Sequence, residues 1–397
     1  MQQIYLDNAS TSFPKPREVS DAVYHYMTGM GSNIGRGGYA SAYAAEEAVF
    51  AARQLLCDFF GGEDPKNVVF TKNITEALNV LLRGLLQSGD HVLVSAMEHN
   101  AVMRPLQLLG HELAADEQPS DTITFSRVPC DREGNLELEY LPKLVRPNTK
   151  AIVMTHASNV CGTLLPLTEV GAFCKEHNLL LIVDSAQSAG LFPIHMQSLG
   201  IDALAFTGHK GLLGPQGMGG FILREHMVEQ VLPLIVGGTG SLSHTERTPT
   251  FMPDKFEAGT LNLPGIMGLA AGVRWLHERG LDNIRNHELA LTEQLLAGLL
   301  ALEQQGLLRV VGRKDITRRT SVVSIADTTL DIAMVAHKLA AEYGIATRVG
   351  LHCAPNAHKT LGTYPTGTLR FSMGWHNSAA DIATALAALE EVLRHGV

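Results

Sequence analysis

The segment "LLLIVDSAQSAG", residues 179–190, is a continuous apolar run that ends at the acidic residue Asp184 and continues into small and polar residues. A short apolar run of this kind is typical of a strand buried on both faces of a parallel sheet. Comparable runs occur before and after it, at 67–71, 91–95, 151–158, 203–209 and 219–224. Between most of them lie helical patterns, as at 74–87, 136–146 and 167–178. This alternation predicts an α/β fold with a mostly parallel sheet that helices cover.

The pattern changes after about residue 258. A long helical region over 265–304 is followed by short strand candidates and by helices near 330–343 and 378–395, which is typical of an α+β arrangement. The intervening segment 236–260 is polar and rich in Gly, Thr and Pro, and long irregular segments are usually functional or part of an interface. We therefore expect two domains, a large one of residues 14–258 and a small one of residues 1–13 and 259–397.

The overall composition limits the classes of function. The chain has 397 residues, a formal net charge of -9 and no cluster of Lys and Arg, which disfavours a nucleic-acid or anionic-membrane surface. No apolar run approaches the ~18 residues that a membrane span needs, and the first residues lack the features of a signal peptide. The five cysteines are scattered without CxxC pairs, as in a reducing compartment. We expect a cytoplasmic protein.

Two residues that follow apolar runs have a functional and a plain interpretation. Lys210 stands in "FTGHKGLLGPQG" (206–217), where most lysines would simply face solvent. Alternatively it forms a Schiff base with a planar cofactor, whose close approach Gly208 and Gly211 would permit. Asp184 either caps a following helix or keeps a pyridinium nitrogen protonated, as a pyridoxal phosphate enzyme requires.

Three further segments carry weaker signals. In "TKNITEALN" (71–79), Asn73 or Thr75 caps a helix, or the helix start binds a phosphate. His99, just after the next strand, either is structural or stacks on a flat ring. The glycine-rich "GMGSNIGRGG" (29–38) lacks the spacing and the preceding strand of a dinucleotide site, so we predict a flexible loop.

The order of these features resembles the class V, fold type I, pyridoxal 5'-phosphate (PLP) enzymes, and within them the SufS-like cysteine desulfurases and selenocysteine lyases. The resemblance covers nearly the whole chain, from "YLDNAST" (5–11) to "LRFSMGWHN" (369–377), and includes "MEHNA", "SNVCGT", "VDSAQ", "TGHKGLLGP", "FEAGT" and "RVGLHCAP". It implies a large domain built on a mostly parallel mixed sheet, a smaller α+β C-terminal domain, PLP as the cofactor and a homodimer.

The resemblance also implies roles for individual residues around the cofactor. Lys210 would carry PLP and move the substrate proton, Asp184 would pair with the pyridinium nitrogen, and His99 would stack on the ring. Gln187 would bind the ring oxygen. The phosphate would be held by Ile74, Thr75, Thr207 and His209, and by Thr260 reaching across the dimer interface.

A second set of residues would act on the substrate. Asn159, Arg348 and Arg370 would bind the carboxylate of an amino acid, for which a guanidinium fork is well suited. Cys353 matches the nucleophile of the family, and Arg348 and His352 are the neighbours expected to favour its thiolate. A metal site of His352, Cys353 and His358 is a poor alternative, because the spacing is irregular and no second cluster exists.

These residues predict a cysteine desulfurase that converts L-cysteine to L-alanine, leaves a persulfide on Cys353 and passes sulfur to an acceptor protein. The alternatives are a selenocysteine lyase acting on L-selenocysteine, or another class V reaction such as a transaminase, epimerase or β-lyase. The chain departs from the family at Gly35, where SufS-like members often carry a histidine near the site.

Overall fold

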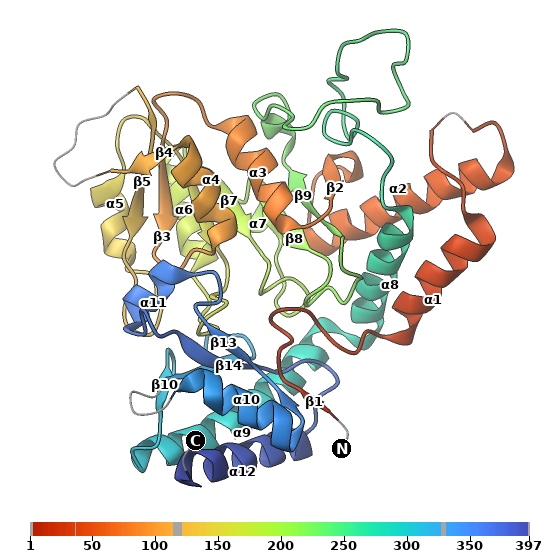
Figure 1. Cartoon of the computed structure of the whole chain (residues 1–397). Helices are drawn as coiled ribbons and strands as arrows, with labels where there is room; N and C mark the ends of the chain where they lie inside the picture. Colours follow the sequence, from red (N-terminus) through yellow and green to blue (C-terminus); the bar gives the residue numbers. More distant parts are fainter. Residues whose placement is uncertain (1–2, 36, 114–120, 327–330, 396–397) are drawn as a thin grey trace.

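The computed structural model describes residues 3–35, 37–113, 121–326 and 331–395 (Figure 1). An eight-stranded sheet lies at the centre of the larger part of the chain, in the order β2-β9-β8-β7-β6-β3-β5-β4. Its strands are β2 (Val68–Thr71), β3 (His91–Ser95), β4 (Gly110–Glu112), β5 (Ile123–Val128), β6 (Thr149–Thr155), β7 (Leu180–Asp184), β8 (Ala203–Thr207) and β9 (Gly219–Leu223). β9 is antiparallel to β2 and β8, and the other pairings of these strands are parallel. The predicted α/β class is confirmed.

Helices cover both faces of this sheet, because successive strand residues point to opposite sides. On one face, the core contains Val92 and Val94 of β3 together with α3 (Ile74–Leu85) and α4 (Asn100–Leu109). On the other face, Leu93 packs with the remaining helices of the large sheet, namely α2 (Ala40–Phe60), α6 (Leu167–His177), α7 (Met196–Leu199) and α8 (Leu263–Arg279). α1 (Arg17–His25) and the π-helix η1 (Tyr26–Met30) lie beside α8 and α2 at one side of the molecule (Figure 1).

The C-terminal part contains a separate four-stranded antiparallel sheet, β10 (Arg309–Val311), β11 (Val322–Ala326), β14 (Thr368–Ser372) and β13 (Arg348–Gly350), in that order. Its core is shared with α9 (Leu281–Gln304), α10 (Ile332–Tyr343) and α12 (Ala379–His395). The N-terminal strand β1 (Ile4–Tyr5) pairs with β12 (Ile345–Ala346), and Asp7 bridges to Ser372. On this basis we propose the division into residues 14–258 and residues 1–13 with 259–397.

Two of the predicted helices differ from the structure. The segment 136–146 contains the 3-10 helix η3 (Leu138–Tyr140) and the short α5 (Leu141–Leu144), so the prediction of one helix there is wrong. Pro142 lies inside the predicted helix, and because proline is tolerated only in the first turn, α5 begins just before it at Leu141. The region 265–304 is two helices, α8 and α9, which separate at Gly280 with a φ of 80°. The remaining short elements are η2 (Pro65–Asn67), η4 (Glu225–Met227) and α11 (Pro355–Leu361).

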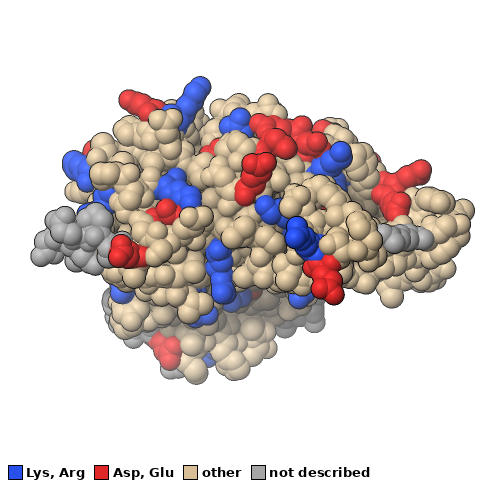
Figure 2. Space-filling model, turned by 90° about the horizontal axis from the view of Figure 1, so that it is seen from above, with Lys and Arg blue, Asp and Glu red and all other residues tan. Residues whose placement is uncertain are grey.

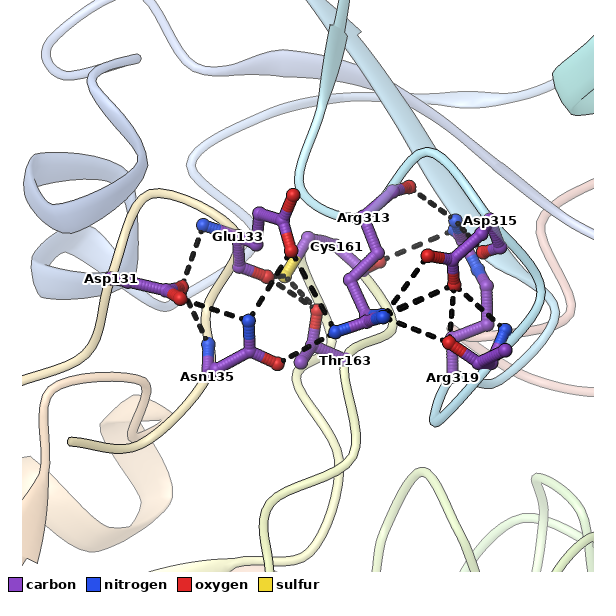
Figure 3. Close-up of polar contacts among 9 residues, drawn as sticks. Asp131, Glu133, Asn135, Cys161, Thr163, Arg313, Asp315 and Arg319 are labelled. Atoms are coloured by element: carbon purple, nitrogen blue, oxygen red, sulfur yellow. Dashed lines mark hydrogen bonds and ion pairs between the residues drawn. The ribbon is translucent and has the colours of Figure 1, made fainter. Parts of the chain in front are cut away.

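A polar network joins loops of the large sheet to the C-terminal sheet (Figure 3). The Arg313 guanidinium donates a 3.0 Å hydrogen bond to Asn135. Arg319 is fully buried and donates to the carbonyl of Cys161, at 3.4 Å, and to that of Val322, at 2.6 Å. These contacts fix the position of the C-terminal sheet relative to the large sheet.

Within the described ranges, no helix has the length and apolarity needed to cross a bilayer. Lys and Arg side chains are interspersed with Asp and Glu on the face shown in Figure 2.

Candidate active site

Asp184 and Lys210 come together because β7 and β8 are neighbouring parallel strands whose carboxyl ends lie at one edge. Asp184 is 2% exposed, and its Oδ1 accepts a 2.8 Å hydrogen bond from the N–H of Ala186. Burial raises the pKa of Asp184, and the positive charge of Lys210 opposes that rise. Burial likewise lowers the pKa of Lys210 to about 8, and the Asp184 carboxylate opposes that fall. The next helix, α7, begins only at Met196, so the helix-cap interpretation of Asp184 is wrong.

The loop that follows Asp184 packs backbone to backbone against the loop that carries Lys210. A Cβ on Gly190 would lie 2.1 Å from the carbonyl oxygen of Gly211, and a Cβ on Gly211 would lie 2.3 Å from that of Ala189. Gly190 also has a φ of 87°. Only glycine fits both positions, so the two glycines hold the acid and the lysine in a fixed arrangement.

Two polar side-chain atoms without partners in the described residues lie at the end of β8. Thr207 Oγ1 and His209 Nδ1 are buried and have no hydrogen-bond partner within the described part of the chain. Thr207 pairs with Gly219, and a Cβ on Gly219 would lie 2.9 Å from the backbone nitrogen of Ile74. The N-terminus of α3 therefore lies beside Thr207, where its positive end favours a phosphate. Asn73 caps this helix, since its Oδ1 accepts from the N–H of Glu76 at 2.9 Å.

His99 and Gln187 extend the site around Lys210. The Nδ1 of His99 accepts a 3.0 Å hydrogen bond from the N–H of Ala101, so the residue also caps α4. Burial lowers the pKa of His99 to about 4, and the nearby charge of Lys210 contributes, so the ring is neutral. Gln187 lines the same open cavity as Lys210, of about 510 Å³, and its amide donates to the carbonyl of Ala9 at 3.0 Å.

Two arginines face the site from the C-terminal sheet. Arg348 and Arg370 are directly opposed residues of β13 and β14, so their side chains share one face of the sheet. Arg370 is 2% exposed and forms 2.9 Å contacts with the Asn159 carbonyl and the Asp7 carboxylate. Both guanidinium groups also donate to the Ser10 hydroxyl, Arg348 at 2.7 Å and Arg370 at 2.8 Å.

Cys353 is exposed on a turn of unusual backbone geometry. His352 and Cys353 have φ values of 47° and 57°, in the left-handed region that costs an L-residue about 1–2 kcal/mol. Both carbonyls of the turn are anchored. The Asn159 amide donates to that of His352 at 2.6 Å, and the Asn100 N–H donates to that of Cys353 at 2.8 Å. Such strain persists where the surroundings over-determine the conformation, which is common at functional sites.

One expectation about this turn is wrong. His352 is 6% exposed and shares a 2.9 Å hydrogen bond with the Thr368 hydroxyl. Burial lowers the pKa of His352 to about 2, with a further contribution from Arg370, so a neutral ring adjoins Cys353. It therefore cannot favour the thiolate by positive charge. Within the described residues, no group of three or more His, Cys, Asp or Glu side chains could hold a metal ion.

Two of the residues predicted to bind the phosphate are exposed. Thr260 lines a pocket of about 750 Å³ with Glu76 and Asn262, and Lys210 does not line that pocket. Thr75 is exposed in the first turn of α3. Gly35 has a φ of 115° and donates its N–H to the Glu46 carboxylate at 2.9 Å. A histidine would be strained at that φ, so the backbone conformation itself favours glycine over the histidine that SufS-like members often carry.

Sequence reasoning missed several contributors. Asp7 and Ser10 lie in the quoted "YLDNAST" segment, but their contacts with Arg370 join residues more than 350 positions apart. Asn100 acts through its backbone, which leaves no side-chain signal. Glu98 is 1% exposed and accepts from the Thr155 N–H at 2.9 Å, and its position immediately before His99 was the available signal.

A mostly parallel sheet with an acid and a lysine at its carboxyl edge, and with polar groups beside a helix start that have no partner among the described residues, defines an α/β protein whose site lies at the carboxyl ends of the strands. The sequence profile of the family "Aminotransferase class-V" matches residues 4–384, and the chain belongs to this family. The resemblance inferred from the sequence is confirmed.

Relatives of similar length are more specific. A "Probable cysteine desulfurase" of Pyrococcus abyssi is 32% identical over 98% of this chain and 94% of its own. "Cysteine desulfurase CsdA" of Escherichia coli is 30% identical over 98% of this chain and 94% of its own. The apo cysteine desulfurase structure from Thermococcus onnurineus NA1 superposes with a TM-score of 0.90 at 32% identity, covering 100% of this chain and 96% of that one. The CsdA structure with an S-sulfonic acid gives 0.85 at 28% identity, with the same coverage.

Proposed function

We propose that this enzyme is a PLP-dependent cysteine desulfurase, which converts L-cysteine to L-alanine and keeps the sulfur as a persulfide on Cys353. The observation that carries the proposal is the anchored turn of Cys353. One of its carbonyls is bound by Asn100, next to His99, and the other by Asn159, which in turn binds Arg370. An exposed thiol is thereby held between the predicted cofactor and carboxylate sites. The relatives that carry the name cysteine desulfurase support the same function.

The residues present fit PLP. When bound, PLP supplies an electron sink for an amino-acid substrate. The unpartnered Thr207 hydroxyl and His209 Nδ1, with the start of α3, would hold its phosphate. The buried Asp184 would pair with the ring nitrogen, and the neutral ring of His99 would stack on its face. Because burial lowers the pKa of Lys210 to about 8, its neutral amine is accessible near physiological pH and can take a proton from the substrate Cα.

The remaining residues act on the substrate. Arg370, with Arg348 and Asn159, would bind the α-carboxylate. The reacting form of Cys353 is the thiolate, whose Sγ attacks the substrate sulfur. The S–S bond forms as the Cβ–S bond breaks, and the electron pair of the broken bond stays on carbon, which takes a proton to give alanine. Sulfur is thus oxidised to the level of a persulfide while carbon is reduced in the same step, and no outside oxidant is required.

Other features support proposals about the oligomeric state and the cellular location of the protein. Large apolar side chains are exposed along residues 24–50, namely Tyr24, Met27, Tyr39, Tyr43 and Phe50. We propose that they lie in a homodimer interface across which the exposed Thr260 reaches the phosphate of the neighbouring subunit. The exposed Cys353 suits sulfur transfer to an acceptor protein, and the five free cysteines suit the cytoplasm. Light scattering should give twice the mass of one chain, and a monomer with full cofactor content would contradict the dimer.

The sulfur chemistry is tested with single cysteine variants. Cys353→Ala and Cys353→Ser should bind PLP with the wild-type absorbance but release no alanine from L-cysteine. The half-buried Cys130 provides the control, and Cys130→Ala should keep its activity. Full activity in Cys353→Ala would show that the thiol mechanism is wrong. If that variant loses activity on L-cysteine yet turns over L-selenocysteine at the wild-type rate, selenocysteine lyase is the better description.

A further inference from the structure

Three of the five N–H donors of Arg370 are engaged by other residues of the chain. A guanidinium has five N–H donors in a fixed plane. Both hydrogens of Nη2 are used, one by the Asp7 carboxylate at 2.9 Å and one by the Ser10 hydroxyl at 2.8 Å. One hydrogen of Nη1 binds the Asn159 carbonyl at 2.9 Å. The buried Nε has no partner within the described residues. The free donors are therefore Nε–H and the second hydrogen of Nη1.

These two free donors cannot bind one carboxylate together. A carboxylate meets a guanidinium bidentately along one of two edges, either Nη1 with Nη2 or Nη2 with Nε. Nη1 lies on the side of Cδ, so Nε–H and the free Nη1–H point in different directions. Both edges require a hydrogen of Nη2. A bidentate ligand of Arg370 can bind only when Asp7 or Ser10 releases that nitrogen.

Asp7 is the partner that conflicts with an incoming carboxylate. The Ser10 hydroxyl is neutral; it accepts from Arg348 and Arg370 and donates to Asp7 at 2.8 Å. A second carboxylate on Arg370 would instead lie close to the charge of Asp7, and like charges at that distance repel. The Asp7 backbone is fixed by its bridge to Ser372, whereas its side chain is 18% exposed and has solvent into which it can turn.

We propose that Asp7 is an internal substitute for the substrate carboxylate, which occupies Arg370 in the empty enzyme and is displaced when an α-amino acid binds. The inference rests on the proposed role of Arg370 in binding substrate. Asp7 also compensates the two opposed guanidinium groups while the site is empty. Each binding event then exchanges one carboxylate for another, so Asp7 weakens the binding of substrate and of alanine and speeds the release of product.

The test compares the holoenzyme with Asp7→Asn, which keeps an oxygen acceptor for Nη2 but loses the charge. L-alanine binding is measured at equilibrium by the change in cofactor absorbance, and the KM and kcat for L-cysteine are measured separately. A charge-assisted hydrogen bond is roughly twice as strong as a neutral one, so the substrate carboxylate displaces the neutral amide of Asp7→Asn more easily than the carboxylate of Asp7, and alanine should bind roughly tenfold more tightly in Asp7→Asn. The KM should fall in parallel, and kcat should stay level or fall because release slows.

The controls separate charge from general disturbance. Asp7→Ser, also uncharged and polar, is measured in parallel so that the result does not depend on one variant folding. Asp7→Glu keeps the negative charge and should bind L-alanine as weakly as the wild type does. Asp21→Asn removes the carboxylate of an exposed ion pair with Arg17, 3.3 Å apart, and should change neither constant.

Two outcomes distinguish this inference from the proposed function. If Arg370→Lys weakens alanine binding while Asp7→Asn and Asp7→Ser bind alanine no more tightly than wild type, the role of Asp7 is wrong and that of Arg370 stands. If Arg370→Lys leaves alanine binding unchanged and the wild type forms no alanine from L-cysteine, the proposed function itself is wrong.

Discussion

The backbone N–H of Asn100 donates a 2.8 Å hydrogen bond to the carbonyl oxygen of Cys353. This contact joins the first residue of α4 to the left-handed turn that presents the thiol, across the boundary between the large sheet and the C-terminal part. His99, the N-cap of α4, immediately precedes Asn100. The position of Cys353 is thus tied to the helix whose cap residue would lie against the cofactor.

Asn100→Pro removes this hydrogen bond with little other change. Proline is tolerated at the first position of a helix, and His99, with φ of -77° and ψ of 155°, already has the extended conformation that a following proline requires. We expect the free energy of unfolding to fall by about 1 kcal/mol. The rate of alanine formation from L-cysteine should fall several-fold, with unchanged cofactor absorbance, because the turn has lost one of its two anchors.

Asn100→Ala is the matched control, since it changes the side chain and keeps the N–H. It should retain the wild-type rate. If the alanine and proline variants are equally active, the hydrogen bond does not position Cys353.

Thr207→Val should have opposite effects on the apoprotein and on cofactor binding. The Thr207 hydroxyl is buried without a partner in the described residues, and a buried unsatisfied hydroxyl costs about 1–3 kcal/mol. The isosteric valine should therefore raise the free energy of unfolding of the apoprotein and weaken PLP binding. Thermal unfolding of the apoprotein and an equilibrium titration with PLP measure the two effects.

Thr155→Val provides the contrast, because Thr155 is also buried at a strand end but its hydroxyl binds the Ala157 carbonyl at 3.0 Å. This variant should destabilise the apoprotein. A Thr207→Val variant that is destabilised and binds PLP normally would show that the hydroxyl has no place in the phosphate site.

The cavity that Lys210 lines also contains a buried acid, Glu288, which should make stability depend on pH. Burial raises the pKa of Glu288 to about 8, although the Ser321 hydroxyl donates to it at 2.7 Å. Between the pKa of Glu288 in the unfolded state and its higher pKa in the folded state, the folded protein keeps a proton on Glu288 that the unfolded protein has lost. The stabilisation is complete below the unfolded pKa and is lost as the pH rises to about 8, at about 1.4 kcal/mol per pH unit.

Burial also raises the pKa of Glu98 to about 8, so the effect of Glu288 is obtained as the difference between the wild type and Glu288→Gln from pH 6.5 to 8. Several buried histidines have a pKa that burial lowers to about 4, and they raise stability with pH only below about 6.5, namely His91, His99, His156, His209 and His358. Glu288→Gln should reduce the loss of unfolding free energy over this range by roughly 2 kcal/mol, measured with denaturant at both pH values. The exposed Glu293 lies on the same helix, and Glu293→Gln should leave the loss unchanged. Equal losses in all three proteins would show that Glu288 ionises normally.

The sequence was sufficient where local pattern and sheet geometry decide the outcome. Asp184 and Lys210 each follow an apolar strand, and parallel neighbouring strands bring their carboxyl ends together, so the pair could be predicted without coordinates. Asn73 as the cap of α3 is equally local, because its side chain bonds three residues ahead.

The sequence was insufficient where packing between distant segments decides. The charge of His352 could not be inferred from its place beside Cys353, because burial under the C-terminal sheet sets its pKa. The engagement of Arg370 by Asp7 depends on β1 returning to the C-terminal part, and no periodicity records that pairing. Helix formation over 136–146 failed for a local reason, Pro142, which is tolerated in the first turn of a helix but not in its interior.

Arg319 lies at the junction between the two sheets, and its replacement should loosen that junction. It is fully buried and donates to backbone carbonyls, including those of Cys161 and Val322. Arg319→Leu would leave these carbonyls without donors, so the free energy of unfolding in urea should fall by about 3 kcal/mol or more. Arg318→Leu alters the adjacent, exposed arginine and should cost less than about 0.5 kcal/mol. A similar small loss in both variants would mean that water replaces Arg319 at the carbonyls and that the junction is held by the apolar cores instead.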